Sequence, residues 1–245
     1  MSLAGRGVVL TRPRELAQAF AKRIEGRGAH AIVFPTIEIQ PLPAPAVLRD
    51  VARFDFVVFV SPSAVRVART MLPSWPATPR AVAISFGTKR ELDQAGIAPV
   101  IVPQSGADSE AVLAAPELQQ VAGKRVLIIR GDDGRPVLGD ALAARGAKVD
   151  YAECYRRVRP AADAAPLLAA GKRGEVHAVV ALSAQALGNF IDMTQGAFSA
   201  ATPFFVSHER IARHARGLGV REVVVAATSD DAMIERLVAY FDGRN

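Results

Sequence analysis

Residues 124–160 read KRVLIIRGDDGRPVLGDALAARGAKVDYAECYRRVRP and contain a predicted strand, a helix and a second strand. The first strand, 125–129, is apolar and rich in β-branched residues, which is typical of a strand buried on both faces. After a polar turn, apolar residues recur at helical spacing as far as Gly146, a helix stop signal. The second strand, 148–155, ends at Tyr155, where a linker would leave the domain.

The same unit occurs near the N-terminus. Residues 5–12 (GRGVVLTR) align with 123–130 (GKRVLIIR), and each segment is followed by an amphipathic helix that ends in Arg-Gly-Ala. The other matching pairs are 54–61 with 176–183, 82–88 with 204–208, and 98–102 with 222–225. Strands that alternate with helices twice over predict two doubly wound α/β domains with mainly parallel sheets.

Extended segments bracketed by prolines mark where the chain passes between the two domains. We expect a discontinuous domain 1 made of residues 1–36 and 159–245, and a domain 2 made of residues 41–152. The linkers, 36–41 and 152–159, would pair as a two-stranded ladder and act as a hinge.

The composition indicates a globular protein with an acidic partner. Half of the 245 residues are hydrophobic, and the formal net charge is +6. A single cysteine, Cys154, excludes an internal disulfide, and residues 1–6 do not resemble a signal peptide, so we expect a cytoplasmic protein without a membrane partner. The cations are scattered rather than clustered, which favours a polyanionic small molecule over nucleic acid.

Small and hydroxylated residues follow the predicted strands, where open parallel sheets bind their ligands. They are Ser61, Ser63, Ser85, Gly87, Thr88, Ser109, Ser183, Ser207, Thr228 and Ser229. Such residues often cap the helix that follows, and capping explains about half of them. The other interpretation is that several helix N-termini bind the anionic groups of one ligand.

Signatures of metal or cofactor chemistry are missing from the sequence. It has no P-loop, no G-x-G-x-x-G and no G-x-S-x-G. His208 and His214 are six residues apart on a predicted helix and cannot share a face. Asp132 and Asp133 fit a solvated turn, and Cys154 fits a packed thiol. We therefore expect no metal and no cofactor.

Tyr155 is one of three tyrosines and stands beside Arg156 and Arg157 at the predicted hinge. One interpretation is an amphipathic residue on a linker strand. The other is a phenol that donates a proton or a hydrogen bond to a leaving oxygen.

At these residues the chain resembles the uroporphyrinogen-III synthase family. The motifs that carry the resemblance are LTRP at 10–13, FVSPSAV at 59–65, FGT at 86–88, SE at 109–110, RG and GR within 130–135, YRR at 155–157, VSHERIA at 206–212 and SDDAM at 229–233. Two residues depart from the family pattern. Ser63 stands where many members have asparagine, and Phe86 stands where a glycine or another small residue is common.

The resemblance implies two α/β lobes and an enzyme that uses no cofactor, and we expect the protein to be a monomer. Its substrate would be hydroxymethylbilane, a linear tetrapyrrole polycarboxylate, closed to uroporphyrinogen III with loss of water and inversion of the terminal pyrrole through a spiro intermediate. By resemblance, Tyr155 is the candidate acid. Arg12, Arg130, Gly131 and Arg135 would bind carboxylates together with the strand-end residues named above.

Two other functions fit the residues. A non-catalytic bilobal binding or sensor module for an anionic metabolite would also lack catalytic signatures, and it would leave hydroxymethylbilane to close to the uninverted isomer. A nucleic-acid-binding protein fits the positive charge, and it would show a steep salt dependence of binding to arbitrary DNA.

Overall fold

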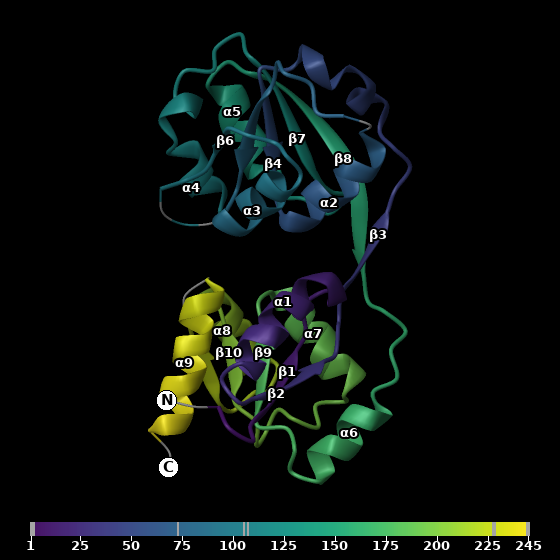
Figure 1. Cartoon of the computed structure of the whole chain (residues 1–245), viewed down its shortest axis with the longest axis vertical. Helices are drawn as coiled ribbons and strands as arrows, with labels where there is room; N and C mark the ends of the chain where they lie inside the picture. Colours follow the sequence, from purple (N-terminus) through teal and green to yellow (C-terminus); the bar gives the residue numbers. More distant parts are fainter. Residues whose placement is uncertain (1–2, 73, 105, 107, 227–228, 244–245) are drawn as a thin grey trace. The chain divides into compact units, whose positions relative to one another are not determined.

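The computed structural model describes residues 3–72, 74–104, 106, 108–226 and 229–243, and the chain forms two α/β units (Figure 1). Unit 1 comprises Met1–Glu38 and Val158–Asn245, and unit 2 comprises Ile39–Arg157. None of the helices in those described ranges is both long and apolar enough to cross a membrane.

Unit 1 contains a parallel sheet with the strand order β11-β10-β9-β1-β2. The strands are β1 (Gly7–Leu10), β2 (His30–Val33), β9 (Ala178–Ala181), β10 (Phe204–Val206) and β11 (Val223–Val225). The helices are α1 (Arg14–Glu25), α6 (Ala165–Lys172), α7 (Ala184–Met193), α8 (Glu209–Gly217) and α9 (Asp230–Asp242). Residues of α1 and α9 pack on one face of the sheet, and residues of α6, α7 and α8 pack on the other.

Unit 2 contains a sheet with the order β3-β8-β7-β4-β5-β6. The strands are β3 (Glu38–Pro41), β4 (Phe56–Phe59), β5 (Arg80–Ala83), β6 (Val100–Ile101), β7 (Arg125–Gly131) and β8 (Lys148–Val158). The helices are α2 (Pro62–Met71), α3 (Phe86–Gln94), α4 (Ser109–Leu113) and α5 (Val137–Ala144), with the short 3₁₀ helices η1 (Ala46–Arg53) and η2 (Pro116–Leu118). One face packs against η1, α2 and α3, and the other against α4, η2 and α5.

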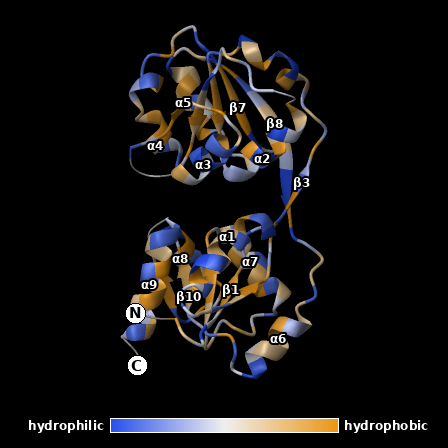
Figure 2. Cartoon of the chain, in the orientation of Figure 1, coloured by the Kyte–Doolittle hydropathy of each residue, from blue (hydrophilic) through white to orange (hydrophobic). Residues whose placement is uncertain are grey.

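The strands β1, β7 and β10 are largely hydrophobic, whereas parts of β3 and β8 and many helical residues are hydrophilic (Figure 2). In β4 and β1 every residue is buried, because helices cover both faces of a doubly wound sheet. The predicted fold class is therefore confirmed.

The internal repeat is confirmed by the order of the strands. In unit 1 the order is β2-β1-β9-β10-β11, and the segments that match them in sequence form β8-β7-β4-β5-β6 in unit 2. The two units differ in chain order, because the strand–helix–strand unit comes first in unit 1 and last in unit 2. Unit 2 also adds β3 at the edge of its sheet, next to β8.

β8 is longer than the sequence predicted and continues to Val158. It lies beside β3, and the backbone N–H of Leu42 donates to the carbonyl of Cys154 at 2.8 Å. The two proline-marked segments are thus neighbouring strands of one sheet along much of their length.

A β-bulge interrupts the pairing of β7 with β8. Arg130 pairs with Glu153 but Gly131 pairs with Tyr155, so Cys154 is the extra residue. Strict alternation would place Tyr155 on the same face as Glu153. Because of the bulge, Tyr155 instead joins Cys154 in the core beneath α2 and α3.

The close approach of α5 to β8 predicts a large effect of one substitution. A Cβ atom at Gly139 would lie 1.9 Å from the hydroxyl of Tyr151, whose ring is also stacked under the Arg130 guanidinium. We expect Gly139→Ala to lower the free energy of unfolding by about 1–3 kcal/mol, measured by urea denaturation.

Gly188→Ala is the matched control, since Gly188 also lies within a helix and its added Cβ would meet nothing closer than 3.9 Å. This variant should be more stable than the wild type by roughly 0.5–1 kcal/mol. Equal destabilisation by the two substitutions would contradict the packing of α5 on β8.

Candidate active site

The carboxyl ends of β4 and β7 form the switch point of the unit 2 sheet. From β4 the chain moves outward through β5 and β6, and it then returns to the other side of β4 as β7 and β8. Ligands of open α/β sheets bind where the strand order reverses in this way. Ser61 follows β4 and Gly131 ends β7, so two predicted site residues flank the switch point.

Tyr155 reaches across this switch point from β8. Its hydroxyl lies 2.9 Å from the Oγ of Ser61, although β7 separates β8 from β4 in the sheet. Neighbouring strands are about 4.8 Å apart, so the side chain must pass over the end of β7. Gly131 permits this passage, because a Cβ atom there would lie 2.9 Å from the Tyr155 ring. The backbone N–H of Asp132 also donates to the Tyr155 carbonyl at 2.9 Å.

The surroundings of Tyr155 keep its phenol protonated at neutral pH. Burial raises the pKa of Tyr155, and the hydrogen bond with Ser61 and the charge of Arg157 oppose this rise. Asp133 and Cys154 add to it. A protonated phenol at the end of a strand can act as a proton donor. Burial also raises the pKa of Cys154 to about 11, which confirms the prediction of a packed thiol.

Four of the predicted serines are helix caps. Each accepts a backbone N–H three residues further on: Ser61 from Ala64 at 3.0 Å, Ser85 from Thr88 at 3.2 Å, Ser183 from Ala186 at 3.0 Å and Ser229 from Ala232 at 3.2 Å. A capping hydroxyl keeps its own proton and a second lone pair. The capping and anion-binding interpretations are therefore compatible for these residues.

The cap of α4 is Asp108 rather than Ser109. The Asp108 carboxylate accepts from the N–H of Ala111 at 2.9 Å, and Ser109 is the first residue of the helix. Asp108 was not among the predicted caps, all of which were small or hydroxylated residues. An aspartate is as good a cap as a serine, so the residue type alone could have identified it.

The other predicted residues lie in several environments. Ser63 and Thr88 are buried in the first turns of α2 and α3, and Gly87 lies in the first turn of α3. Ser207 is buried at the end of β10 and donates to the carbonyl of Leu182 at 3.4 Å. Arg135 is exposed before α5, and Thr228 lies outside the described residues.

Arg12, at the end of β1, has a carboxylate partner within unit 1. Both of its terminal nitrogens lie 3.1 Å from an oxygen of Asp230, and its guanidinium stacks over the ring of Phe20 at 4.7 Å. Arg23 also pairs with Asp230 and with Asp231. Both aspartates belong to the SDDAM motif at 229–233 and lie in the first turn of α9.

Arg130 occupies the equivalent position of the repeat, at the end of β7. It pairs with Glu153 at 2.9 Å and stacks over the Tyr151 ring at 4.0 Å. It also donates to the carbonyl of Gly134 at 3.0 Å. Both strand-end arginines are thus held by an acid and an aromatic ring, which partly neutralises the charge that they offer to a ligand.

Phe86 is an exposed aromatic residue at the start of α3. It is 59% exposed, the largest value among the exposed large hydrophobic residues of the described chain. A Cβ atom at the neighbouring Gly87 would lie 3.9 Å from Pro62, which begins α2. The first turns of α2 and α3 therefore lie close together, and Phe86 is the first residue of α3. The sequence had marked Phe86 only as a departure from the family pattern.

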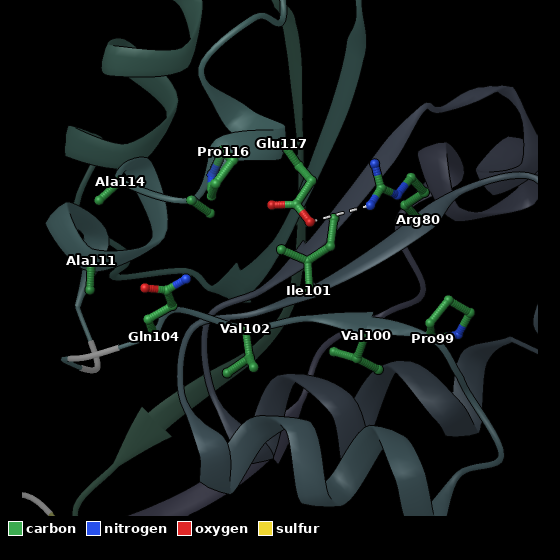
Figure 3. Close-up of a pocket in the computed structure, with 11 residues that line it drawn as sticks. Arg80, Pro99, Val100, Ile101, Val102, Gln104, Ala111, Ala114, Pro116 and Glu117 are labelled. Atoms are coloured by element: carbon green, nitrogen blue, oxygen red, sulfur yellow. Dashed lines mark hydrogen bonds and ion pairs between the residues drawn. The ribbon is translucent and has the colours of Figure 1, made fainter.

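A cavity of about 550 Å³ lies elsewhere in unit 2, beside the edge strand β6 (Figure 3). Val100 and Ile101 form part of its lining, and Arg80 pairs with Glu117 across it at 3.4 Å. Its lining includes no site residue predicted from the sequence.

Among the described residues, no group of three or more histidine, cysteine, aspartate or glutamate side chains is placed to hold a metal.

Comparisons with known proteins agree on one family. A family model described as uroporphyrinogen-III synthase HemD matches residues 18–235. The chain is 33% identical over 250 residues to the uroporphyrinogen-III synthase of Escherichia coli K12, covering 94% of this chain and 99% of that protein. It is 34% identical over 243 residues to the enzyme of the same name from Salmonella typhimurium, with the same coverage.

Two solved structures share the fold. Uroporphyrinogen-III synthetase from Helicobacter pylori superposes with a TM-score of 0.66 at 15% identity, covering 96% of this chain and 99% of that one. A mutant uroporphyrinogen III synthase from Thermus thermophilus gives 0.61 at 21% identity, with 97% and 99% covered. These structures share the fold, and the family model together with the sequence relatives shows that the chain belongs to the uroporphyrinogen-III synthase family.

Proposed function

We propose that this chain is an enzyme that closes hydroxymethylbilane to uroporphyrinogen III, with loss of water and inversion of the terminal pyrrole ring. The family match spans most of the chain, and its curated relatives carry the name of this activity. The observation that carries the chemistry is the protonated phenol of Tyr155, held across the switch point against Ser61.

The reaction needs little chemical assistance from the protein. The lone pair of the pyrrole nitrogen can expel the substrate hydroxyl, and protonation of the leaving oxygen lets it depart as water. Tyr155 is the proposed source of that proton. Because the substrate can also close unaided to the uninverted isomer, most of the catalysis lies in holding it in one folded geometry.

The helix N-termini at the strand ends are the proposed carboxylate-binding groups. The caps Ser61, Ser85, Ser183 and Ser229 begin helices whose first N–H groups and dipoles favour negative charge. Ser63, Gly87, Thr88, Ser109, Gly131, Arg135, Ser207 and Thr228 complete the proposed set with Arg12 and Arg130. The net charge of +6 suits a polycarboxylate substrate.

This proposal extends to the setting of the enzyme. We infer that it acts as a cytoplasmic monomer, without cofactor or nucleic-acid partner, and that residues 36–41 and 152–159 act as a hinge. The family match disfavours the sensor-module alternative. An isomer analysis of the product formed from hydroxymethylbilane, with and without the protein, tests the activity directly, and a product containing only the uninverted isomer would refute it.

The role of Tyr155 is tested by Tyr155→Phe, which removes one hydroxyl and keeps the ring. Turnover at saturating substrate should fall by roughly 10²-fold, because the proton source is lost while positioning remains. Substrate binding should change by no more than about 1 kcal/mol. Wild-type turnover in a variant shown by thermal melting to be folded would remove Tyr155 from the mechanism.

Phe86 should contact a pyrrole ring of the substrate, since it is an exposed aromatic residue at the start of α3, next to the proposed site residues Ser85 and Gly87. We expect Phe86→Ala to raise KM by about two- to tenfold, the value of one aromatic stacking contact, with kcat nearly unchanged. Leu218→Ala is the control, because Leu218 is an exposed apolar residue in the other unit. An unchanged KM in the Phe86 variant would show that the ring does not touch the substrate.

A further inference from the structure

The hydrogen bonds of Ser61 leave one hydroxyl proton unassigned. A serine hydroxyl offers two lone pairs and one proton. One lone pair of Ser61 accepts the N–H of Ala64 at 3.0 Å, and the oxygen also lies 2.9 Å from the Tyr155 hydroxyl. If Tyr155 donates to the second lone pair, both lone pairs are used and the Ser61 proton can point to a ligand.

Exposure favours this direction of the hydrogen bond. Tyr155 is only 4% exposed, whereas Ser61 is half-buried at the start of α2. Of the two hydroxyl groups, the one that a substrate reaches more easily is therefore that of Ser61. Tyr155 holds the more acidic proton, because a phenol ionises far more readily than an aliphatic alcohol.

We propose that Ser61 and Tyr155 form a proton relay, in which Ser61 delivers a proton to the leaving hydroxyl of the substrate and takes a replacement from Tyr155. This inference rests on the proposed function and changes the role of Ser61 from carboxylate binding to catalysis. In the relay Tyr155 is the source of the proton and Ser61 is the group that touches the reacting oxygen.

The proton balance of the relay closes over one turnover. The O–H bond of Ser61 breaks as its proton moves to the substrate oxygen, and the carbon–oxygen bond breaks with its electron pair leaving in water. The Tyr155 proton moves to Ser61, which then donates a hydrogen bond to the phenolate. When the macrocycle closes, the substrate carbon loses a proton, and the relay carries it back to Tyr155.

Burial disfavours a transient Tyr155 phenolate, so its stabilisation depends on the groups around the pair. Arg157 approaches Tyr155, and its own partner is Asp133 at 2.8 Å. Cys154 stays a neutral thiol. The hydrogen bond with Ser61 lowers the pKa of Tyr155 more than the charge of Arg157 does, so stabilisation of the phenolate depends mainly on the Ser61 hydroxyl and on the N-terminus of α2 that Ser61 caps.

Ser61 also has a structural role, and the variants must separate it from the relay. Ser61→Ala removes both the hydroxyl and the cap of α2, while Ser61→Thr retains both. Asp108→Ala removes the cap of α4 in the same unit, from a residue that the proposed site does not include. If capping were the only role of Ser61, Ser61→Ala and Asp108→Ala would lower the stability of the protein to a similar extent, and neither would change turnover.

Turnover of hydroxymethylbilane is the first measurement. We expect Ser61→Ala to lower kcat by about ten- to a hundredfold, Ser61→Thr to restore most of it, and Asp108→Ala to leave it near the wild-type value. In the background of Tyr155→Phe, Ser61→Ala should cause almost no further loss, because residues of one relay are not additive. A full additional loss there, or normal kcat in folded Ser61→Ala, would overturn the relay.

Ultraviolet titration of the tyrosines is the second measurement and needs no turnover. The difference between wild type and Tyr155→Phe isolates the Tyr155 phenol from Tyr151 and Tyr240. Removing the Ser61 hydroxyl should raise the pKa of Tyr155 further, since that hydrogen bond lowers it. An unchanged pKa of Tyr155 in an active protein would overturn the relay and leave the proposed function standing. A wild-type protein that forms no inverted isomer would overturn the proposed function itself.

Discussion

The passage of the Tyr155 side chain over Gly131 is the contact on which the site depends. It needs a bulge that turns Tyr155 toward α2, a strand end without a side chain, and a serine on the strand beyond. Each condition comes from a different strand of the unit 2 sheet. A side chain at Gly131 would clash with the Tyr155 ring, and a regular register would place Tyr155 on the other face, so either change would separate the phenol from Ser61.

The fold could be predicted because its signals are local and repeated. Alternating apolar strands and amphipathic helices, matched between two halves of the chain, predicted the fold class, whereas the order of the strands in each sheet comes from the structure. Tyr155 could be selected from its position at the end of a long strand. Its orientation could not, because strict alternation places it beside Glu153, and only the pairing of β7 with β8 reveals Cys154 as the extra residue.

The contacts of the site residues could not be predicted from neighbouring positions in the sequence, for a related reason. Ser61 and Tyr155 are 94 residues apart, and Arg12 and Asp230 are 218 apart. Such pairs are created by the order of strands in the sheet rather than by spacing in the chain. Helix caps, by contrast, involve neighbours three residues apart, and the sequence anticipated four of them.

The different chain order of the two repeats affects how the protein folds during synthesis. Unit 2 is a continuous segment, so its sheet can be completed while the later part of the chain is still being made. In unit 1, β1 pairs with both β2 and β9, and Val8 and Ala178 are aligned across a very long loop. Closing such a loop is entropically costly and slow. During synthesis, the edge of β1 that pairs with β9 therefore stays unpaired until Ala178–Ala181 have been added to the chain.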